Sequence, residues 1–237
     1  MKGVATVSCH VERPLDDRCW AAFSGLQARR PGGFAIAALL RPPDPDAGES
    51  ETLWLARARI AATRGPLGHH THWGGAAQAR PLDGDPAGRV RREAAWLRER
   101  GLEPRLFCGG GWYTDEEVAR ALAELGYADC TATAFRPSYL AGPAPRLALD
   151  EPGWLRLGEA RLLELPSTHT LGMAARAAFG RLPAYVHVYF HDTDLLDSRR
   201  RRALTTALTT IARRRRPTSL DAVSAEAETD FAERWRE

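Results

Sequence analysis

Short apolar runs alternate with helix-forming segments along most of the chain, and this alternation constrains the fold more than any other feature. Runs that predict strands cover residues 4–9, 34–40, 66–72, 105–108, 127–135 and 184–190, with a hairpin or a strand entered through a turn at 155–157 and 161–165. Patterns that predict helices cover residues 16–29, 53–62, 85–100, 114–125, 173–179 and 198–214. Strands that are each followed by a helix favour a parallel α/β architecture.

The boundaries of these elements predict one continuous domain. Asp85-Pro86 opens a strongly periodic helix, and Gly101 ends it. The Pro- and Asp-rich residues 41–51 form a loop that is too short to link two domains. No GxGxxG motif follows the first strand, which argues against an open dinucleotide-binding sheet. The 237 residues therefore predict a single domain over 1–237, built as a closed or nearly closed (β/α) barrel.

Composition and charge exclude several classes of function. No apolar run approaches the roughly 20 residues that span a bilayer, and the chain enters its first strand without room for a signal peptide. We therefore expect a cytoplasmic protein without a membrane partner. Basic runs at 199–202 and 213–216 could bind an anionic partner, but no aromatic platform or nucleic-acid motif accompanies them, so nucleic acid is not expected. The 4 cysteines lack CxxC spacing and are expected to be free thiols, and the sequence does not indicate an oligomeric state.

Chemically active side chains follow the carboxyl ends of the expected strands, where the catalytic groups of (β/α) barrels lie. They are His10 and Glu12 after the first strand, His70, His72 and Trp73 after the third, Cys108, Gly110, Trp112 and Tyr113 after the fourth, His169 after the sixth, and His191 and Asp192 after the seventh. Five histidines from four strand ends are therefore expected to converge on one mouth of the barrel.

Residues 68–75, GHHTHWGG, hold three of the 7 histidines. On a strand, His70 and His72 point the same way, as two ligands of one metal should, whereas His69 points to the opposite face and is expected to pack. Either ligand taken alone fits a structural hydrogen bond to a neighbouring loop equally well. Near the end of the chain, His191 precedes Asp192, whose carboxylate would raise the basicity of the imidazole and suit it for general acid catalysis.

The glycine run at 109–111 and the aromatic residues after it allow more than one interpretation. Backbone N–H groups of such a run could cradle a phosphate, but no GK[ST] follows, so a tight turn that lets substrate approach the backbone is favoured. Trp112 and Tyr113 fit either the core or a stacking surface for a sugar. His187, in the middle of an expected strand, fits a hydrogen-bonded core histidine better than a ligand.

The order of these segments resembles the polysaccharide deacetylase group (NodB homology, carbohydrate esterase family 4). The resemblance covers most of the chain and rests on GHHTHW, FCGGGWYTDEEVARALAELGY, RLLELPSTHT and YVHVYFHDTDLLD. The second of these segments is similar to the family's RPPxGWYT…AL…LGY segment. The resemblance implies a distorted (β/α)7 barrel that hydrolyses N- or O-acetyl groups on sugars such as N-acetylglucosamine.

The resemblance also implies a divalent metal, commonly zinc, held by an aspartate and two histidines, with a second aspartate as base and a late histidine as acid. This sequence departs from that pattern. His10 stands where an aspartate belongs, and Glu12 aligns with the glutamate of related subgroups that read DVE. Gly74 replaces the second histidine of the usual H[S/T]xxH motif, and Cys108 replaces the arginine of the third motif. The late histidine is retained as His191.

Three interpretations of this altered site stay open. A rewired centre would bind zinc or another transition metal through His10, His70 and His72. A metal-free amide hydrolase would use His10 and His191 as an acid/base pair. A non-catalytic protein of the same fold would only bind a glycan or an anion.

We expect the rewired hydrolase, acting on a C–N amide or acetyl ester of a carbohydrate-like substrate. His191 is then the general acid, and Glu12 or Asp192 is the base and a possible further metal ligand. A soluble glycan precursor or a small amide fits a chain without an export signal better than cell-wall material does. The residues expected to contact the substrate are Trp73, Cys108, Gly110, Trp112, Tyr113 and His169.

Overall fold

The computed structural model describes residues 3–137 and 146–234. Its strands are β1 (Val4–Val11), β2 (Ala37–Leu40), β3 (Leu67–Thr71), β4 (Leu106–Gly109), β5 (Ala128–Asp129), β6 (Gly153–Leu157), β7 (Ala160–Glu164), β8 (His169–Thr170), β9 (Tyr185–His191) and β10 (Arg216–Pro217). Its α-helices are α1 (Asp17–Arg29), α2 (Glu51–Ala62), α3 (Pro86–Glu99), α4 (Glu116–Leu125), α5 (Leu171–Ala177), α6 (Ser198–Ala212) and α7 (Leu220–Arg234). Short 3-10 helices are η1 (Pro31–Gly33), η2 (Gly110–Trp112) and η3 (Asp192–Leu196).

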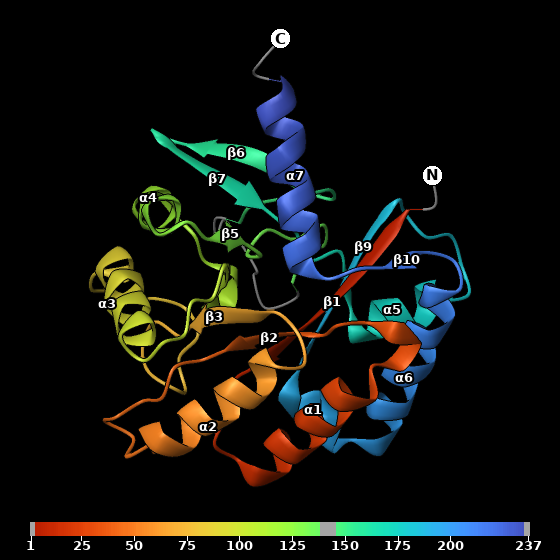
Figure 1. The fold of residues 1–237 in the computed structure, drawn as a ribbon, viewed down its shortest axis with the longest axis horizontal. Helices are drawn as coiled ribbons and strands as arrows, with labels where there is room; N and C mark the ends of the chain where they lie inside the picture. Colours follow the sequence, from red (N-terminus) through yellow and green to blue (C-terminus); the bar gives the residue numbers. More distant parts are fainter. Residues whose placement is uncertain (1–2, 138–145, 235–237) are drawn as a thin grey trace.

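The strands form one curled sheet with helices packed around its outside (Figure 1). Neighbouring strands follow the order β6-β7-β5-β4-β3-β2-β1-β9-β8, and β10 pairs with the start of β1. Within the described residues the pairings between these strands are parallel, apart from the β6–β7 hairpin. Parallel neighbours require a crossover on the outer face, and α1, α2 and α3 supply it between successive strands from β1 to β4.

The segment between β7 and β8 joins the two ends of this sheet and closes it into a barrel. On one side, the backbone N–H of Leu165 donates to the carbonyl oxygen of Asp129 at 2.7 Å. On the other side, the backbone N–H of Thr168 donates to the carbonyl oxygen of His187 at 3.0 Å, and β8 continues the pairing with β9. β7 and β8 therefore share one position in the wall. The result is the distorted (β/α)7 barrel that the sequence predicted.

Apolar side chains fill the barrel and also the space beneath the helices. Leu39 and Leu106 are buried in the interior cluster, together with Tyr185 at the start of β9. Leu220 and Val223 of α7 belong to the same cluster, so α7 covers the amino-terminal end of the barrel. Burial of each such side chain contributes about 1.5–3 kcal/mol to stability. The carboxyl ends of the strands, where the polar residues gather, lie at the other end.

Some boundaries differ from the expectation. β5 covers two residues instead of 127–135, because the carboxylate of Asp129 accepts the backbone N–H of Thr131 at 2.9 Å and forms a turn that ends the strand. α2 begins at Glu51, inside the expected loop, because Ser50 caps it. α7 was not predicted. Among the described helices, none is both long and apolar enough to cross a membrane.

Candidate active site

A pocket of about 270 Å3 opens at the carboxyl ends of β1, β3, β4 and β9. These strand ends meet because parallel strands of a barrel all finish at the same rim. The pocket is lined by His10, Glu12, His70, Ala79, Arg80, Gly109, Gly111, Trp112 and His191. The structure thus brings together residues from the first, second, third and last of the sequence motifs.

Glu12 lies at the centre of this group. Its Oε1 atom is 3.4 Å from Nε2 of His191, 3.6 Å from Nε2 of His72 and 4.0 Å from Nε2 of His70. Burial alone would raise the pKa of Glu12, but the neighbouring imidazoles of His72, His191 and His70 favour the ionised carboxylate and lower it to about 2. The carboxylate is therefore ionised at neutral pH.

His70 and His72 are held so that one nitrogen of each ring stays free. Nδ1 of His70 lies 2.9 Å from the carbonyl oxygen of Cys108, and Nδ1 of His72 lies 3.1 Å from that of Ala76. A carbonyl oxygen only accepts hydrogen bonds, so each Nδ1 carries a proton and each Nε2 is left for another partner. Both Nε2 atoms are buried without a hydrogen-bond partner among the described residues. Burial, with the nearby His72, lowers the pKa of His70 to about 3, which keeps this imidazole neutral.

These observations fit a divalent metal site. Glu12, His70 and His72 each offer a ligand atom, and these atoms lie within 4.8 Å of one another. Neutral imidazoles whose Nδ1 atoms donate to carbonyl oxygens are the usual arrangement of metal-binding histidines, and a carboxylate supplies charge. A buried Nε2 atom without a partner is costly unless something binds it. The donor set suits zinc or a related transition metal.

His10 lies beside His70, but it falls in a different candidate group from Glu12 and His72. Its ligand atom groups with those of His70 and Cys108, so His70 is shared between two candidate groups. Its ring centroid lies 4.7 Å from that of His70 and 5.3 Å from that of Trp112. Nε2 of His10 is buried without a partner, and burial with the neighbouring imidazoles holds its pKa well below the usual value. His10 is thus a neutral base at the floor of the pocket.

The acid predicted at the end of the last long strand keeps its place, but its carboxylate partner differs. Burial would lower the pKa of His191, yet the carboxylate of Asp194, whose Oδ2 atom lies 3.8 Å from Nδ1 of His191, and the charge of Glu12 raise it. Asp192, expected as a base, is fully buried, and its two oxygens accept the backbone N–H groups of Arg13 at 2.9 Å and Thr193 at 2.8 Å. Asp192 therefore ties the loop after β1 to the end of β9. Asp194 takes the orienting role, because η3 turns it back toward His191.

The residues expected to form the cleft wall divide into two groups. Trp112 lines the pocket, as expected, and packs against His10. Trp73 and Gly110 do not line it, because Nε1 of Trp73 donates to the carbonyl oxygen of Gly110 at 3.0 Å and ties the two loops together. A Cβ atom on Gly110 would lie 2.5 Å from the carbonyl oxygen of Thr71, so only glycine lets the backbone at residue 110 come this close to the end of β3.

Three other expected wall residues also lie outside the pocket lining. Cys108 is fully buried, and burial holds the pKa of its thiol well above the usual value. The hydroxyl of Tyr113 donates a hydrogen bond to Asp115. Burial and this hydrogen bond together raise the pKa of Tyr113 to about 12. Nδ1 of His169 lies 2.8 Å from Oγ1 of Thr168, and the side chain of His169 is buried. The structure therefore places these side chains in supporting contacts, with Cys108 as a possible ligand beneath His10.

His69 packs on the outward face of β3, as the alternation of side chains along a strand predicted. His69 is fully buried, and its Nε2 atom lies 2.7 Å from Oε2 of Glu93 on α3. Oγ1 of Thr71 donates to the same oxygen at 2.8 Å. This network anchors α3 to the strand that carries His70 on its inner face.

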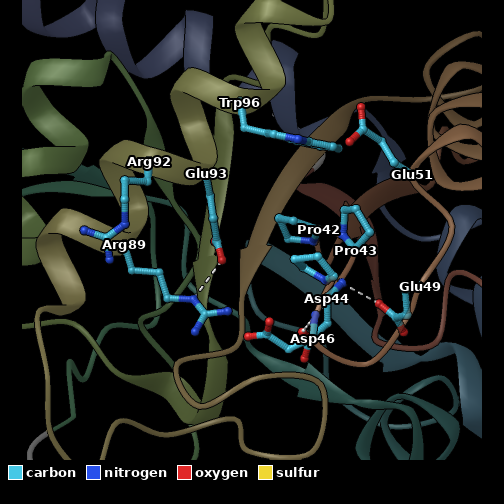
Figure 2. A pocket seen from close by; sticks show the side chains of 11 residues that line it. Pro42, Pro43, Asp44, Asp46, Glu49, Glu51, Arg89, Arg92, Glu93 and Trp96 are labelled. Atoms are coloured by element: carbon cyan, nitrogen blue, oxygen red, sulfur yellow. Dashed lines mark hydrogen bonds and ion pairs between the residues drawn. The ribbon is translucent and has the colours of Figure 1, made fainter.

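A second pocket, of about 390 Å3, lies outside the barrel between α3 and the loop after β2 (Figure 2). Trp96 and Pro42 line it, and its charged side chains bond locally: Arg89 pairs with Glu93 at 2.8 Å, and Glu49 accepts the backbone N–H of Asp44 at 2.6 Å. None of the residues predicted to act in catalysis lines it. The candidate active site is therefore the pocket with the histidines.

Solved structures share this architecture. A protein of Mycobacterium smegmatis, provisionally classed as a polysaccharide deacetylase, superposes with a TM-score of 0.68 at 15% identity, over 98% of this chain and 92% of its own. The fold is that of a polysaccharide deacetylase. A 4-alpha-glucanotransferase from Thermococcus litoralis superposes with a TM-score of 0.57 at 12% identity, over 94% of this chain and 38% of its own. No family model and no curated protein sequence matches the chain.

The comparison confirms the resemblance at the level of the fold, and the site of this deacetylase-type barrel includes residues that sequence reasoning missed. Arg80 lines the pocket from the loop between β3 and α3, and Asp194 contacts His191. Asp194 could have been found from its spacing of three residues after His191, which suits a helical turn. Arg80 follows no periodic segment, so the sequence contains no signal for it.

Proposed function

We propose that this chain is a metal-dependent hydrolase that removes an acetyl-type acyl group from a C–N amide or an ester of a carbohydrate-like substrate. One observation carries the proposal: an ionised carboxylate and two imidazoles with unpartnered Nε2 atoms meet beside His191 at the mouth of a deacetylase-type barrel. Glu12, His70 and His72 would hold the metal. When bound, a divalent ion polarises the acyl carbonyl and makes hydroxide available near neutral pH.

His191 is the proposed general acid. Its raised pKa favours the protonated imidazole, and about a third of its side chain is exposed, so a leaving nitrogen or oxygen can reach it. The backbone N–H of His191 donates to Asp194 Oδ2 at 3.0 Å, which fixes the end of the strand and the ring beside it. His191 therefore holds a proton at the position where a leaving group would need it.

The remaining groups position the substrate and accept a proton. His10 lines the pocket as a neutral imidazole and can accept a proton, although its low pKa makes it a weak base. Trp112 supplies an apolar wall against which an acyl methyl or a sugar face can pack. Glu12, bound between imidazoles, serves as a ligand in this proposal instead of a base.

The test measures metal content and product release together. Purified protein should contain about one equivalent of zinc or a related metal, and it should release acetate from N-acetylglucosamine, its short oligomers or small N-acetyl amides. Chelation and the double variant His70→Ala His72→Ala should each remove both properties, with circular dichroism as the check on folding. A protein that is active without metal would favour the His10–His191 acid/base pair instead. A folded protein that neither binds metal nor releases acetate would refute the proposal.

A further inference from the structure

Among the residues that the structure describes, Arg80 contributes the one Lys or Arg side chain to the lining of the candidate active site. It enters from the loop between β3 and α3. Its NH1 nitrogen donates to the carbonyl oxygen of Gly111 at 3.2 Å, and its guanidinium carbon lies 5.8 Å from the ring centroid of Tyr113. One hydrogen bond uses one of the five N–H donors of the guanidinium, which leaves others for a ligand.

No carboxylate pairs with Arg80 within residues 3–137 and 146–234. Glu12, which lines the same pocket, lies next to the imidazoles and not within ion-pair distance of Arg80. Arg200, which lines another pocket together with His191, is by contrast paired with Asp194 at 2.6 Å. A guanidinium that lacks a protein carboxylate while lining a catalytic pocket is suited to bind an anionic ligand.

The glycine run seats this side chain. Gly111 has a φ of +61°, and a Cβ atom there would lie 2.1 Å from Cγ of Arg80. The stem of Arg80 therefore lies directly on the backbone of η2, an approach that only glycine permits. The run that could have cradled a phosphate thus holds an arginine in place.

The charges of the pocket favour the same type of ligand. Glu12 contributes the one carboxylate among the described residues that line the pocket, and so a single negative charge. A divalent ion at Glu12 would exceed that charge, and Arg80 adds another positive charge. An anionic group on the substrate would balance the excess.

A carboxylate fits better than a phosphate. A planar carboxylate matches the two parallel N–H donors of a single guanidinium, whereas phosphate sites usually gather several backbone N–H groups or cations. The pocket is also small, at about 270 Å3, and must hold the acyl group as well.

We propose that Arg80 binds a carboxylate of the substrate, so that this pocket selects acyl compounds that carry a negative charge near the bond to be cleaved, such as an acidic sugar or an N-acyl amino acid. The cleavage itself rests on the proposed function, but the binding does not. Arg80 is in this assignment a specificity-determining residue and takes no part in proton transfer.

The experiment compares two probes that differ in one group: N-acetylglycine, which has a carboxylate, and N-acetylglycinamide, which has a neutral amide. Calorimetric titration of zinc-loaded and chelator-treated protein gives the preference for the carboxylate. Wild type should bind N-acetylglycine at least about tenfold more tightly, as expected for a charge-assisted bidentate contact. Arg80→Gln should lose that preference, and Arg80→Lys should keep a part of it, because lysine retains the charge without the planar fork. Arg92→Gln, which removes an exposed arginine from the outer pocket of Figure 2, should keep all of it.

Each outcome decides the inference. Equal binding of the two probes by wild type, or a preference that survives in a folded Arg80→Gln variant, would overturn it. The metal contributes equally to probe binding in wild type and in Arg80→Gln, so a difference in affinity between these two proteins reports on the guanidinium alone. A carboxylate preference without any hydrolysis would uphold the anion site and refute the proposed reaction. Hydrolysis of neutral N-acetylglucosamine without a carboxylate preference would uphold the proposed reaction and refute the anion site.

Discussion

His187 lies where the barrel closes, and its burial as a neutral imidazole makes the stability of the fold depend on pH. Its Nε2 atom lies 2.8 Å from Oγ of Ser8, and its Nδ1 atom lies 3.2 Å from the carbonyl oxygen of Pro166. Nδ1 therefore carries the proton, and Nε2 accepts from the Ser8 hydroxyl. Burial lowers the pKa of His187 to about 4, because the imidazolium would lose its hydration.

The size of the effect follows from the two pKa values. In the unfolded chain an imidazole binds its proton with a pKa of about 6.5. Because the folded-state pKa is depressed, the stability contributed by the neutral form is complete above about pH 6.5 and falls as the pH drops toward about 4. At pH 5 the unfolded imidazole is almost fully protonated and the folded one hardly at all. His187 alone should therefore reduce the free energy of unfolding by about 2 kcal/mol between pH 7.5 and pH 5.

Urea unfolding at the two pH values, with chelator present, measures this loss. In His187→Asn the amide nitrogen can still donate toward the carbonyl oxygen of Pro166, but the side chain does not titrate. Its free energy of unfolding should fall by about 2 kcal/mol less than that of wild type over the same interval. Ser8→Ala is the matched control, since it removes the hydrogen bond and keeps the imidazole, so its pH dependence should remain. If wild type and His187→Asn lose stability equally, within about 0.5 kcal/mol, the reasoning is refuted.

Three more predictions concern the pocket. Asp194→Asn should lower the pKa of His191, because this carboxylate is the main influence that outweighs burial; the alkaline limb of the pH–activity profile should then move to lower pH. Gly111→Ala should reduce the free energy of unfolding by about 1–2 kcal/mol through its φ of +61° alone, and further through the clash with Arg80. Glu12→Gln should weaken zinc binding at least about tenfold in competition with a chromophoric chelator, since the loss of an outer-shell partner already costs that much.

Each of these variants has a matched control. Asp197→Asn removes a fully exposed helix-capping carboxylate and should leave the titration of His191 unchanged. Gly84→Ala places Cβ at a φ of +91° with no atom within 4 Å, so it separates backbone strain from the clash. Glu159→Gln removes an exposed carboxylate and should bind zinc as wild type does. Equal effects of a variant and its control would contradict the corresponding argument.

The strand–helix alternation and the inner face of β3 could be predicted because both depend on local periodicity. The period of two along a strand separated His70 from His69, and the structure places His69 against Glu93 on the outside. Glu93 itself could not be identified, because its partner is 24 residues away in the sequence. The short β5 was missed because its end depends on a hydrogen bond of the Asp129 side chain, which periodicity does not show.

The depth of a side chain at a strand end was harder to predict than its presence there. Cys108 and Trp73 follow or end a strand as expected, yet both are buried: Cys108 belongs to the interior apolar cluster, and Trp73 is bonded to the loop at Gly110. The choice between Asp192 and Asp194 depends on how η3 turns the chain after β9. Arg80 belongs to a long loop without a repeating pattern, and its place in the pocket depends on a tertiary contact with Gly111.

The wall segment between β7 and β8 also determines how this molecule can open. The amide of Leu165 is bonded to one neighbour and the amide of Thr168 to the other, so neither half of the sheet can separate while this segment stays in place. Local fluctuations that release a single strand edge do not expose these two amides to water. In a hydrogen-exchange experiment they should exchange only with global unfolding, although they lie between the regular strands and not within them.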